Sequence, residues 1–245
     1  MRFFAIADPH LSFNEEGVMQ KPMSVFGPIW DDHWQKLKTN WMELVEDDDC
    51  VIVAGDISWG LKLEEAKVDL DHLRELPGTK LFFKGNHDLW WLSQKSLDML
   101  YATEGEDGSM IPDPKMRFIK NDAYIADNVA ICGTRGWVCP GSDEFTEHDM
   151  KIYLREAGRL ERSLQAGRDS GAETIIGVLH YPPTNDMHQP SLFTQLMERY
   201  GVKTCVYGHL HKQENFKRGI KCVLNGVEYR LVSYDYVEGR PVRII

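Results

Sequence analysis

The sequence predicts an α/β protein. Short apolar runs of strand length alternate along the chain with segments in which apolar residues recur at helical spacing. Five of the apolar runs lead directly into an Asp, Asn or His, namely Asp8, Asp56, Asn86, His180 and His209. Because open α/β sheets bind ligands at the carboxyl ends of their strands, this pattern predicts a functional site at one edge of a sheet.

Each element is predicted from its local pattern. Branched and aromatic residues predict strands at residues 2–7, 51–54, 81–83, 116–119, 123–126, 129–132, 174–179 and 204–207. Apolar residues at helical spacing predict helices at residues 34–45, 63–73, 93–101, 148–166 and 192–200. Asp31 or Asp32 is the predicted N-cap of the first of these helices, and Ser191 that of the last. Residues 11–29 are predicted to be a long binding loop or lid, and residues 104–114 a surface loop.

The carboxyl-terminal segment predicts a hairpin. Residues 222–224 and 227–236 flank the dipeptide Asn225-Gly226, a strong hairpin-turn signal, and residues 242–245 are predicted to add another strand. Because the chain shows no internal repeat, linker or low-complexity segment, we predict a single domain over residues 1–245.

Charge restricts the class of partner. The formal net charge is −10. Duplex DNA and other long polyanions are bound by Lys and Arg side chains that neutralise phosphates, so this charge argues against duplex nucleic acid as a partner. A small phosphorylated substrate is compatible with it, because bound metal cations would reverse the charge locally.

Cysteine usage and hydropathy predict a cytoplasmic protein. The five cysteines form no Cys-x-x-Cys pair, which favours buried free thiols in a reducing compartment over a disulfide. No apolar run approaches the roughly 18 residues of a membrane span, and the first residues lack a signal peptide's apolar stretch. Cleavage there would also separate Asp8 from the predicted site.

The side chains at the strand ends have the chemistry of metal ligands. Seven of them offer an oxygen or an imidazole nitrogen: Asp8, His10, Asp56, Asn86, His180, His209 and His211. This set suits Mn, Fe, Zn or Co, and not Cu(I) or an iron–sulfur cluster. Seven donors exceed the need of one ion but fit two divalent ions about 3.5–4 Å apart. Asp56 is the predicted bridging ligand, because a carboxylate has two oxygens.

These residues resemble the calcineurin-like metallophosphoesterases. The matching blocks occur in the family's order: Asp8-Pro9-His10, Gly55-Asp56, Gly85-Asn86-His87-Asp88, His180 and Gly208-His209-Leu210-His211. The resemblance implies a four-layer sandwich of two mixed β-sheets flanked by helices, with a dinuclear metal centre at the strand ends.

The resemblance also implies a role for each residue. It assigns Asp8, His10 and His211 to the first ion, and Asn86, His180 and His209 to the second, with Asp56 as the bridge. His87 would be the general acid. We therefore predict a hydrolase in which a hydroxide bridging two ions, with Mn, Fe or Zn the favoured metals, attacks phosphorus and His87 protonates the leaving group. Asp88 is predicted to orient His87.

One departure from the family changes the expected substrate. The protein serine/threonine phosphatases of this family carry an Asp-Arg pair soon after the Gly-Asp block, whereas residues 55–60 read Gly-Asp-Ile-Ser-Trp-Gly. Arg135, between two glycines, is predicted to bind substrate instead; the alternative is a surface ion pair. Four tryptophans near the strand ends are predicted to be core residues rather than walls of a pocket: Trp59, Trp90, Trp91 and Trp137.

Two classes of function remain. The first is an enzyme that hydrolyses a phosphomonoester or a phosphodiester, and the second is a non-catalytic scaffold that has kept the fold. The complete donor set and the intact His87 favour the enzyme. The sequence leaves open which ester is preferred and carries no signal for an oligomeric state.

Overall fold

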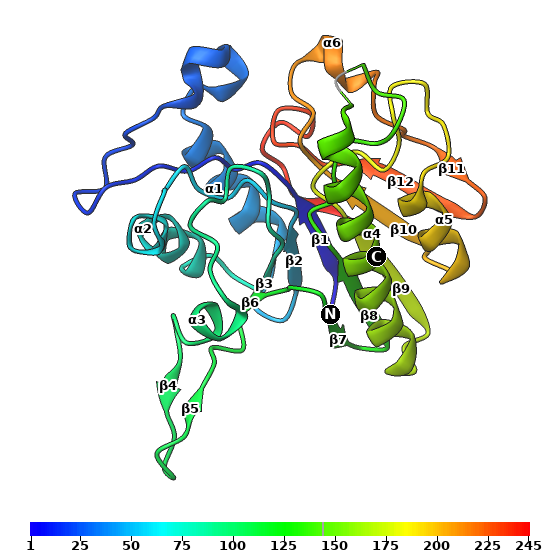
Figure 1. Ribbon diagram of the computed structural model, residues 1–245. Coiled ribbons are helices and arrows are strands. Elements are labelled where there is room, and N and C mark those ends of the chain that lie inside the picture. Colours follow the sequence, from blue (N-terminus) through cyan, green and yellow to red (C-terminus); the bar gives the residue numbers. More distant parts are fainter. Residues whose placement is uncertain (144) are drawn as a thin grey trace.

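Two mixed β-sheets form the centre of the computed structural model, which describes residues 1–143 and 145–245 (Figure 1). The first sheet has the strand order β13 (Val242–Arg243), β1 (Phe3–Ile6), β2 (Cys50–Val53), β3 (Thr79–Phe82) and β6 (Met116–Phe118). The second has the order β11 (Val223–Leu224), β12 (Val227–Leu231), β10 (Thr204–Tyr207), β9 (Thr174–Val178), β8 (Val129–Gly133) and β7 (Ala123–Ala126).

The central strands of both sheets run parallel. The pairs β1–β2, β2–β3 and β3–β6 are parallel in the first sheet, as are β8–β9, β9–β10 and β10–β12 in the second. In these two sheets the antiparallel pairs of the described residues lie at the edges, where β13 pairs with β1, β7 with β8 and β11 with β12. The carboxyl ends of the parallel strands therefore come together, as the sequence predicted.

Helices cover the outer faces of the sheets. Figure 1 shows α1 (His33–Leu44), α2 (Leu63–Arg74) and α3 (Gln94–Asp98) beside the first sheet, and α4 (Glu147–Asp169) and α5 (Leu192–Arg199) beside the second. Short elements complete the chain: the 3₁₀ helices η1 (Met23–Phe26) and η2 (Pro28–Trp30), and α6 (Gln213–Phe216).

Three hydrophobic clusters correspond to the three interfaces of the four layers. Alternate residues of one strand point to opposite faces of its sheet. In β2, Val51 and Val53 pack outward with Trp41 of α1, whereas Ile52 packs inward with Val178 and Val206 of the second sheet. Residues on the outer face of the second sheet pack against α4. The predicted four-layer sandwich is therefore the observed fold.

Most predicted elements form, with two informative differences. Residues 104–114, predicted to be a surface loop, contain a hairpin of β4 (Thr103–Glu104) and β5 (Met110–Ile111), whose turn includes the dipeptide Asp107-Gly108. This hairpin projects from the body at the lower left of Figure 1. The strand predicted at residues 227–236 ends at Leu231, because the chain then turns towards the first sheet, where Ser233 bridges Ala7.

Other local predictions have mixed outcomes. The Asn225-Gly226 turn forms with positive φ at both residues (49° and 85°), and Ser191 caps α5 by accepting a hydrogen bond from the backbone N–H of Thr194. Asp32 precedes α1 without a side-chain capping bond.

The cysteines match their prediction only in part. All five cysteines are free thiols; Cys50, Cys132, Cys139 and Cys205 are buried, and Cys222 is exposed, which differs from the expectation that all are buried. None of the helices in the described part of the chain is long and apolar enough to cross a membrane.

Candidate metal centre

The seven predicted donors lie together at the carboxyl ends of the strands. Asp8 and His10 follow β1, Asp56 follows β2 and Asn86 follows β3. From the second sheet, His180 follows β9, and His209 and His211 follow β10. Residues that are far apart in the sequence are thereby brought into one site, because the strands that carry them are parallel neighbours.

The donors form two clusters. Candidate ligand atoms of Asp8, His10 and His211 lie within 4.8 Å of one another, and so do those of Asp56, His180 and His209. Asn86 joins the second cluster, since its Oδ1 atom lies 2.7 Å from His180 Nε2 and 2.9 Å from His209 Nδ1. Each cluster has the donor chemistry of a site for a divalent ion.

The Asp56 carboxylate lies between the clusters. Its Oδ2 atom is 3.4 Å from His180 Nε2 and 3.8 Å from His10 Nε2, so one oxygen faces donors of both groups. Its Oδ1 atom accepts a hydrogen bond of 2.8 Å from the backbone N–H of His87. This is the arrangement that a bridging carboxylate needs.

Several observations fit a pair of bound cations. Asp8 is fully buried, and its Oδ1 atom has no hydrogen-bond partner among the described residues. Such an orphaned buried oxygen is costly unless a ligand satisfies it. Burial lowers the pKa of His180, but the carboxylates of Asp56 and Asp8 outweigh burial and raise it to about 9. The carboxylates therefore favour positive charge at this position, which a metal ion would supply.

Two of the four histidine donors, His180 and His211, have hydrogen-bond partners that favour the tautomer a metal requires. The Nδ1 atom of His180 lies 3.0 Å from the carbonyl oxygen of Ala54, to which it donates a proton when Nε2 is the ligand atom. His211 Nδ1 lies 3.0 Å from Asp235 Oδ1, which leaves its Nε2 atom towards the cluster, 3.4 Å from His10 Nε2. These partners aim the free nitrogens inward.

The backbone around the ligands is strained and crowded. Four of the seven donors have left-handed φ values: Asp8 (60°), His10 (47°), Asp56 (52°) and His209 (73°). Non-glycine residues in this region cost free energy, and such strain concentrates at functional sites. Asp8 and His10 therefore leave the extended conformation of β1 as they reach the site. A Cβ atom on Gly85 would lie 2.1 Å from Asp56 Oδ1, so only glycine fits there.

Asp88 holds the loops together. It is fully buried and accepts hydrogen bonds from the backbone N–H groups of Asp56 (2.9 Å), Ile57 (2.9 Å) and Gly85 (2.7 Å). Among the described residues it makes no hydrogen bond with the His87 ring, which differs from the predicted orienting contact. Adjacent side chains point apart, and the Asp88 carboxylate is directed at the backbone of the loop that carries Asp56.

His87 lies exposed at the mouth of the site. Its ring centroid is 4.4 Å from that of Trp59 and 5.7 Å from that of His10. Burial of part of the ring lowers its pKa, opposed by the charge of Asp56. A cavity of about 260 Å³ opens beside it, with walls formed by Met23, Phe26, Trp30 and Trp59. Residues 11–29 therefore contribute side chains to the wall of the cavity beside the donor clusters.

The tryptophans are divided between core and pocket. Trp90 is buried in the core, as predicted. Trp59 instead stacks on His10 with ring centroids 4.8 Å apart and lines the cavity together with Trp30. Arg135 does not line this cavity; its side chain enters a neighbouring cleft.

Sequence reasoning missed Asp235. This carboxylate accepts hydrogen bonds from His211 Nδ1 (3.0 Å) and from the backbone N–H of Lys212 (2.8 Å). An acidic residue just past a strand was the available signal, but the strand was predicted to continue through residue 236. Because β12 ends at Leu231, Asp235 lies with the other strand-end residues.

Comparison with known proteins agrees with this geometry. The sequence model of the calcineurin-like phosphoesterases matches residues 1–213. The chain belongs to this family. No curated protein sequence matches it significantly. The family relationship implies phosphoester hydrolysis with divalent metal ions, and the structure contains two candidate donor clusters for such ions.

Solved structures share the fold. Phosphopantetheinyl hydrolase from Mycobacterium tuberculosis superposes with a TM-score of 0.54 at 16% identity, covering 100% of this chain and 95% of that one. The protein TT1561 of Thermus thermophilus also gives a TM-score of 0.54, at 14% identity, covering 86% of this chain and 83% of that one. At these identities the likeness concerns the fold alone.

Replacing Asp235 with alanine is expected to weaken metal binding at the first cluster. Without its carboxylate partner the His211 ring loses its fixed orientation, and loss of such a partner costs about 10–100-fold in metal affinity. Titration of the metal-depleted protein with Mn²⁺ measures the effect. Asp113→Ala is the control, because that carboxylate pairs with Arg74 and belongs to neither donor cluster. Equal Mn²⁺ affinity in Asp235→Ala and the wild type would contradict the assigned role.

Proposed function

We propose that this protein is a dinuclear metal-dependent hydrolase that cleaves a phosphomonoester or phosphodiester of a small molecule. The observation that carries the proposal is the Asp56 carboxylate, one oxygen of which faces donors of both clusters at 3.4 and 3.8 Å. Two separate mononuclear sites, or a structural His–Asp network, would not require a shared oxygen.

Two divalent ions held by the clusters would activate water as a nucleophile and offset the negative charge of the phosphoryl oxygens. The chain itself supplies the rest. One ion would be held by Asp8, His10 and His211. The other would be held by Asn86, His180 and His209, and Asp56 would contact both ions. Asp88 fixes the backbone of the Asp56 loop, and the Ala54 carbonyl and Asp235 keep the ring nitrogens of His180 and His211 aimed at the ions.

His87 is the proposed proton donor. It is exposed beside the cavity, and its ring is placed by Trp59 and by a hydrogen bond from its own backbone N–H to Asp56. An imidazole that binds no metal can give a proton to the departing alkoxide, which leaves far more readily when protonated. The apolar walls formed by Met23, Phe26 and Trp30 suit an organic group attached to the phosphate.

The donor set supports Mn, Fe or Zn as the metals, since it combines carboxylate and amide oxygen with imidazole nitrogen. The alternative, a non-catalytic scaffold, is disfavoured because a scaffold needs neither a complete set of buried ligands nor an exposed histidine at the mouth of the site. Phosphopantetheinyl hydrolase, which shares the fold, is itself named as a hydrolase.

Activity assays distinguish the two functions. Metal-depleted protein is loaded with Mn²⁺, Fe²⁺ or Zn²⁺ and given p-nitrophenyl phosphate and bis-p-nitrophenyl phosphate. We expect hydrolysis of at least one ester with at least one metal, and its loss after chelation. Absence of turnover with every metal and both esters would favour the scaffold.

A further inference from the structure

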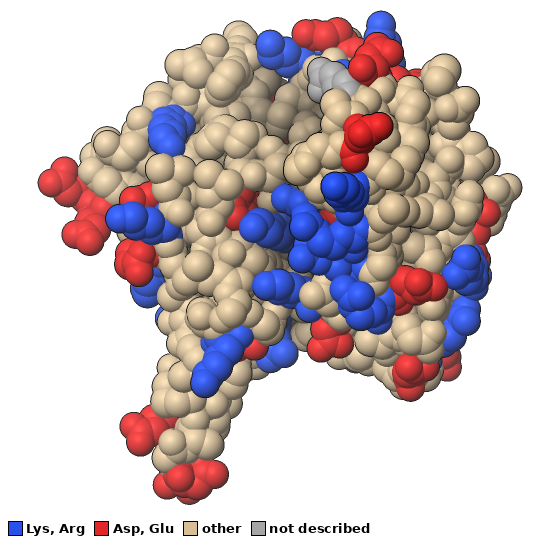
Figure 2. Space-filling model, in the orientation of Figure 1, with Lys and Arg blue, Asp and Glu red and all other residues tan. Residues whose placement is uncertain are grey.

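A basic cleft lies beside the metal centre. Figure 2 shows Lys and Arg side chains gathered in the middle of one face of the molecule. The cleft has a volume of about 250 Å³, and its cationic residues are Lys84, Lys120, Arg135, Arg155 and Arg159. We call this the basic cleft. Such a concentration of positive charge is unexpected in a chain whose net charge is −10.

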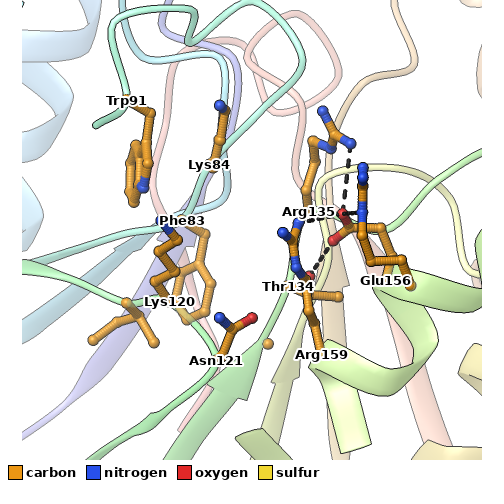
Figure 3. Close-up of a pocket in the computed structure, with 12 residues that line it drawn as sticks. Phe83, Lys84, Trp91, Lys120, Asn121, Thr134, Arg135, Glu156 and Arg159 are labelled. Atoms are coloured by element: carbon orange, nitrogen blue, oxygen red, sulfur yellow. Dashed lines mark hydrogen bonds and ion pairs between the residues drawn. The ribbon is translucent and has the colours of Figure 1, made fainter. Parts of the chain in front are cut away.

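The two walls of the basic cleft come from different sheets. Figure 3 shows Lys84 and Lys120 on one side, and Arg135 and Arg159 on the other. The first two follow β3 and β6 of the first sheet, Arg135 follows β8 of the second, and Arg159 lies on α4. The cleft is therefore formed at the carboxyl ends of strands from both sheets, where α/β folds bind their ligands.

One buried carboxylate organises the arginine wall. Glu156 is fully buried and lies 2.6 Å from Arg159, 3.5 Å from Arg135 and 3.8 Å from Arg155. Its other oxygen accepts a hydrogen bond of 2.5 Å from Thr134. A structural ion-pair network around Glu156 explains why the guanidinium groups are ordered, but one carboxylate does not neutralise three of them.

The lysine wall has no structural partner of this kind. Within the described ranges, no carboxylate lies within ion-pair distance of Lys84 or Lys120. Lys84 is half-buried and lines the same cleft as Arg135. Arg135 Nε is buried without a hydrogen-bond partner among the described residues. Cations that crowd together in a cleft without enough carboxylates to neutralise them are costly, and an anion bound between the walls would offset that cost.

The basic cleft and the metal centre share their backbone. Lys84 precedes the proposed ligand Asn86 by two residues, so their Cα atoms lie within about 7 Å. The carbonyl oxygen of Arg135 accepts hydrogen bonds from the backbone N–H groups of His180 (2.9 Å) and Tyr181 (3.0 Å). A small molecule bound at the metal centre therefore has the basic cleft within reach.

We infer that the basic cleft binds a second phosphate group of the substrate, so that the enzyme acts on a small molecule carrying at least two phosphate groups. This inference rests on the proposed function for the metal centre. The guanidinium group of arginine and the ammonium group of lysine are the side-chain groups that bind phosphate most strongly. The cleft is smaller than a pocket for a whole drug-sized ligand, which suits one group of a larger molecule.

A long polyanion fits less well. Polynucleotide binding depends on many phosphate contacts spread along a strand, whereas here the five cations line one small cleft. The same phosphate chemistry can also come from a free anion that binds independently of substrate. The experiment below separates these cases.

The first arm measures binding without catalysis. Inorganic pyrophosphate is titrated into metal-depleted protein in the presence of chelator, which removes the metal centre as a competing anion site. The test variants are the double variant Lys84→Gln/Lys120→Gln and the single variant Arg155→Gln, which lies on the exposed rim. Arg199→Gln is the control, because it removes one charge from a surface pair with Glu161 outside the cleft. Thermal unfolding verifies that each variant is folded.

We expect the wild type and Arg199→Gln to bind pyrophosphate alike. Both cleft variants should bind pyrophosphate at least about tenfold more weakly, because each loses one or two charge-assisted hydrogen bonds to the anion. Equal affinity in all four proteins would overturn the anion site.

The second arm measures substrate choice with two esters that differ by one phosphate. Metal-loaded protein is given the p-nitrophenyl ester of thymidine 5′-phosphate, with and without a 3′-phosphate. We expect the wild type to favour the 3′-phosphorylated ester, and the double variant to lose the preference through a higher KM while kcat for the simpler ester is retained. Pyrophosphate binding that depends on the cleft, without any substrate preference, would assign the site to a free anion and overturn the inference.

The two proposals fail separately. If neither ester is hydrolysed with any metal while pyrophosphate binding still depends on the cleft residues, the anion site stands, whereas the proposed function and the substrate assignment that rests on it fall. Tight, cleft-dependent binding of single-stranded oligonucleotide, with no preference between the two small esters, would instead point to a polymer and overturn the small-molecule class.

Discussion

Asp56→Asn is expected to lose both metal ions and about 10³-fold or more of the hydrolytic rate. The buried carboxylate faces His10 and His180 with the same oxygen, so an amide removes the negative charge from both clusters at once. Metal ions contribute several kcal/mol to stabilisation of the transition state, and a few kcal/mol correspond to the stated factor in rate.

Metal content after desalting measures this prediction. Wild-type protein should retain two ions per chain, and Asp56→Asn fewer than one. Asp69→Asn is a matched control. Asp69 is equally buried, and burial raises its pKa to about 7, but it accepts hydrogen bonds from Ser58 and Phe13 and belongs to neither donor cluster. The control should keep both ions. Full occupancy in Asp56→Asn would mean that this carboxylate is not the bridge.

His87→Ala is expected to keep both ions and to lose activity selectively. The exposed ring contributes no atom to either donor cluster, so metal content should not change. A general acid contributes about 10²–10⁴-fold, and its contribution is needed most when the leaving group is a poor one. An alkyl phosphate should therefore lose that factor, whereas p-nitrophenyl phosphate should lose much less.

The comparison of the two leaving groups decides the role of His87. His148→Ala, an exposed histidine on α4, serves as the control and should behave as the wild type. Loss of metal in His87→Ala would make His87 a ligand, and an equal loss on both substrates would assign it to substrate binding instead of proton transfer.

Much of this site could be predicted from the sequence because the signal is local. Each donor follows its own apolar strand, and the parallel arrangement of the strands then brings the donors together without further information. Asp56 illustrates this: it directly follows the apolar run at residues 51–54, and as part of an ordered set of such blocks it was predicted to be a metal ligand. The glycines around the ligands were likewise predictable, since crowding beside Asp56 excludes any Cβ atom at Gly85.

Features that depend on the meeting of distant segments could not be predicted. The cations of the basic cleft come from loops after three strands and from one helix, and no motif connects them. Asp88 and Asp235 act on backbone groups and rings that become their neighbours only in the folded chain. Asp235 was obscured by a strand boundary, the least reliable part of any pattern-based prediction. Arg135 was recognised as unusual, but its side chain enters the basic cleft and not the cavity over the metal clusters.

The most direct test of the dinuclear site is anomalous diffraction from crystals of the protein loaded with Mn²⁺. We expect two anomalous peaks about 3.5–4 Å apart, one beside Asp8, His10 and His211 and the other beside Asn86, His180 and His209, with the Asp56 carboxylate between them. A single peak, or peaks away from these residues, would contradict the proposal.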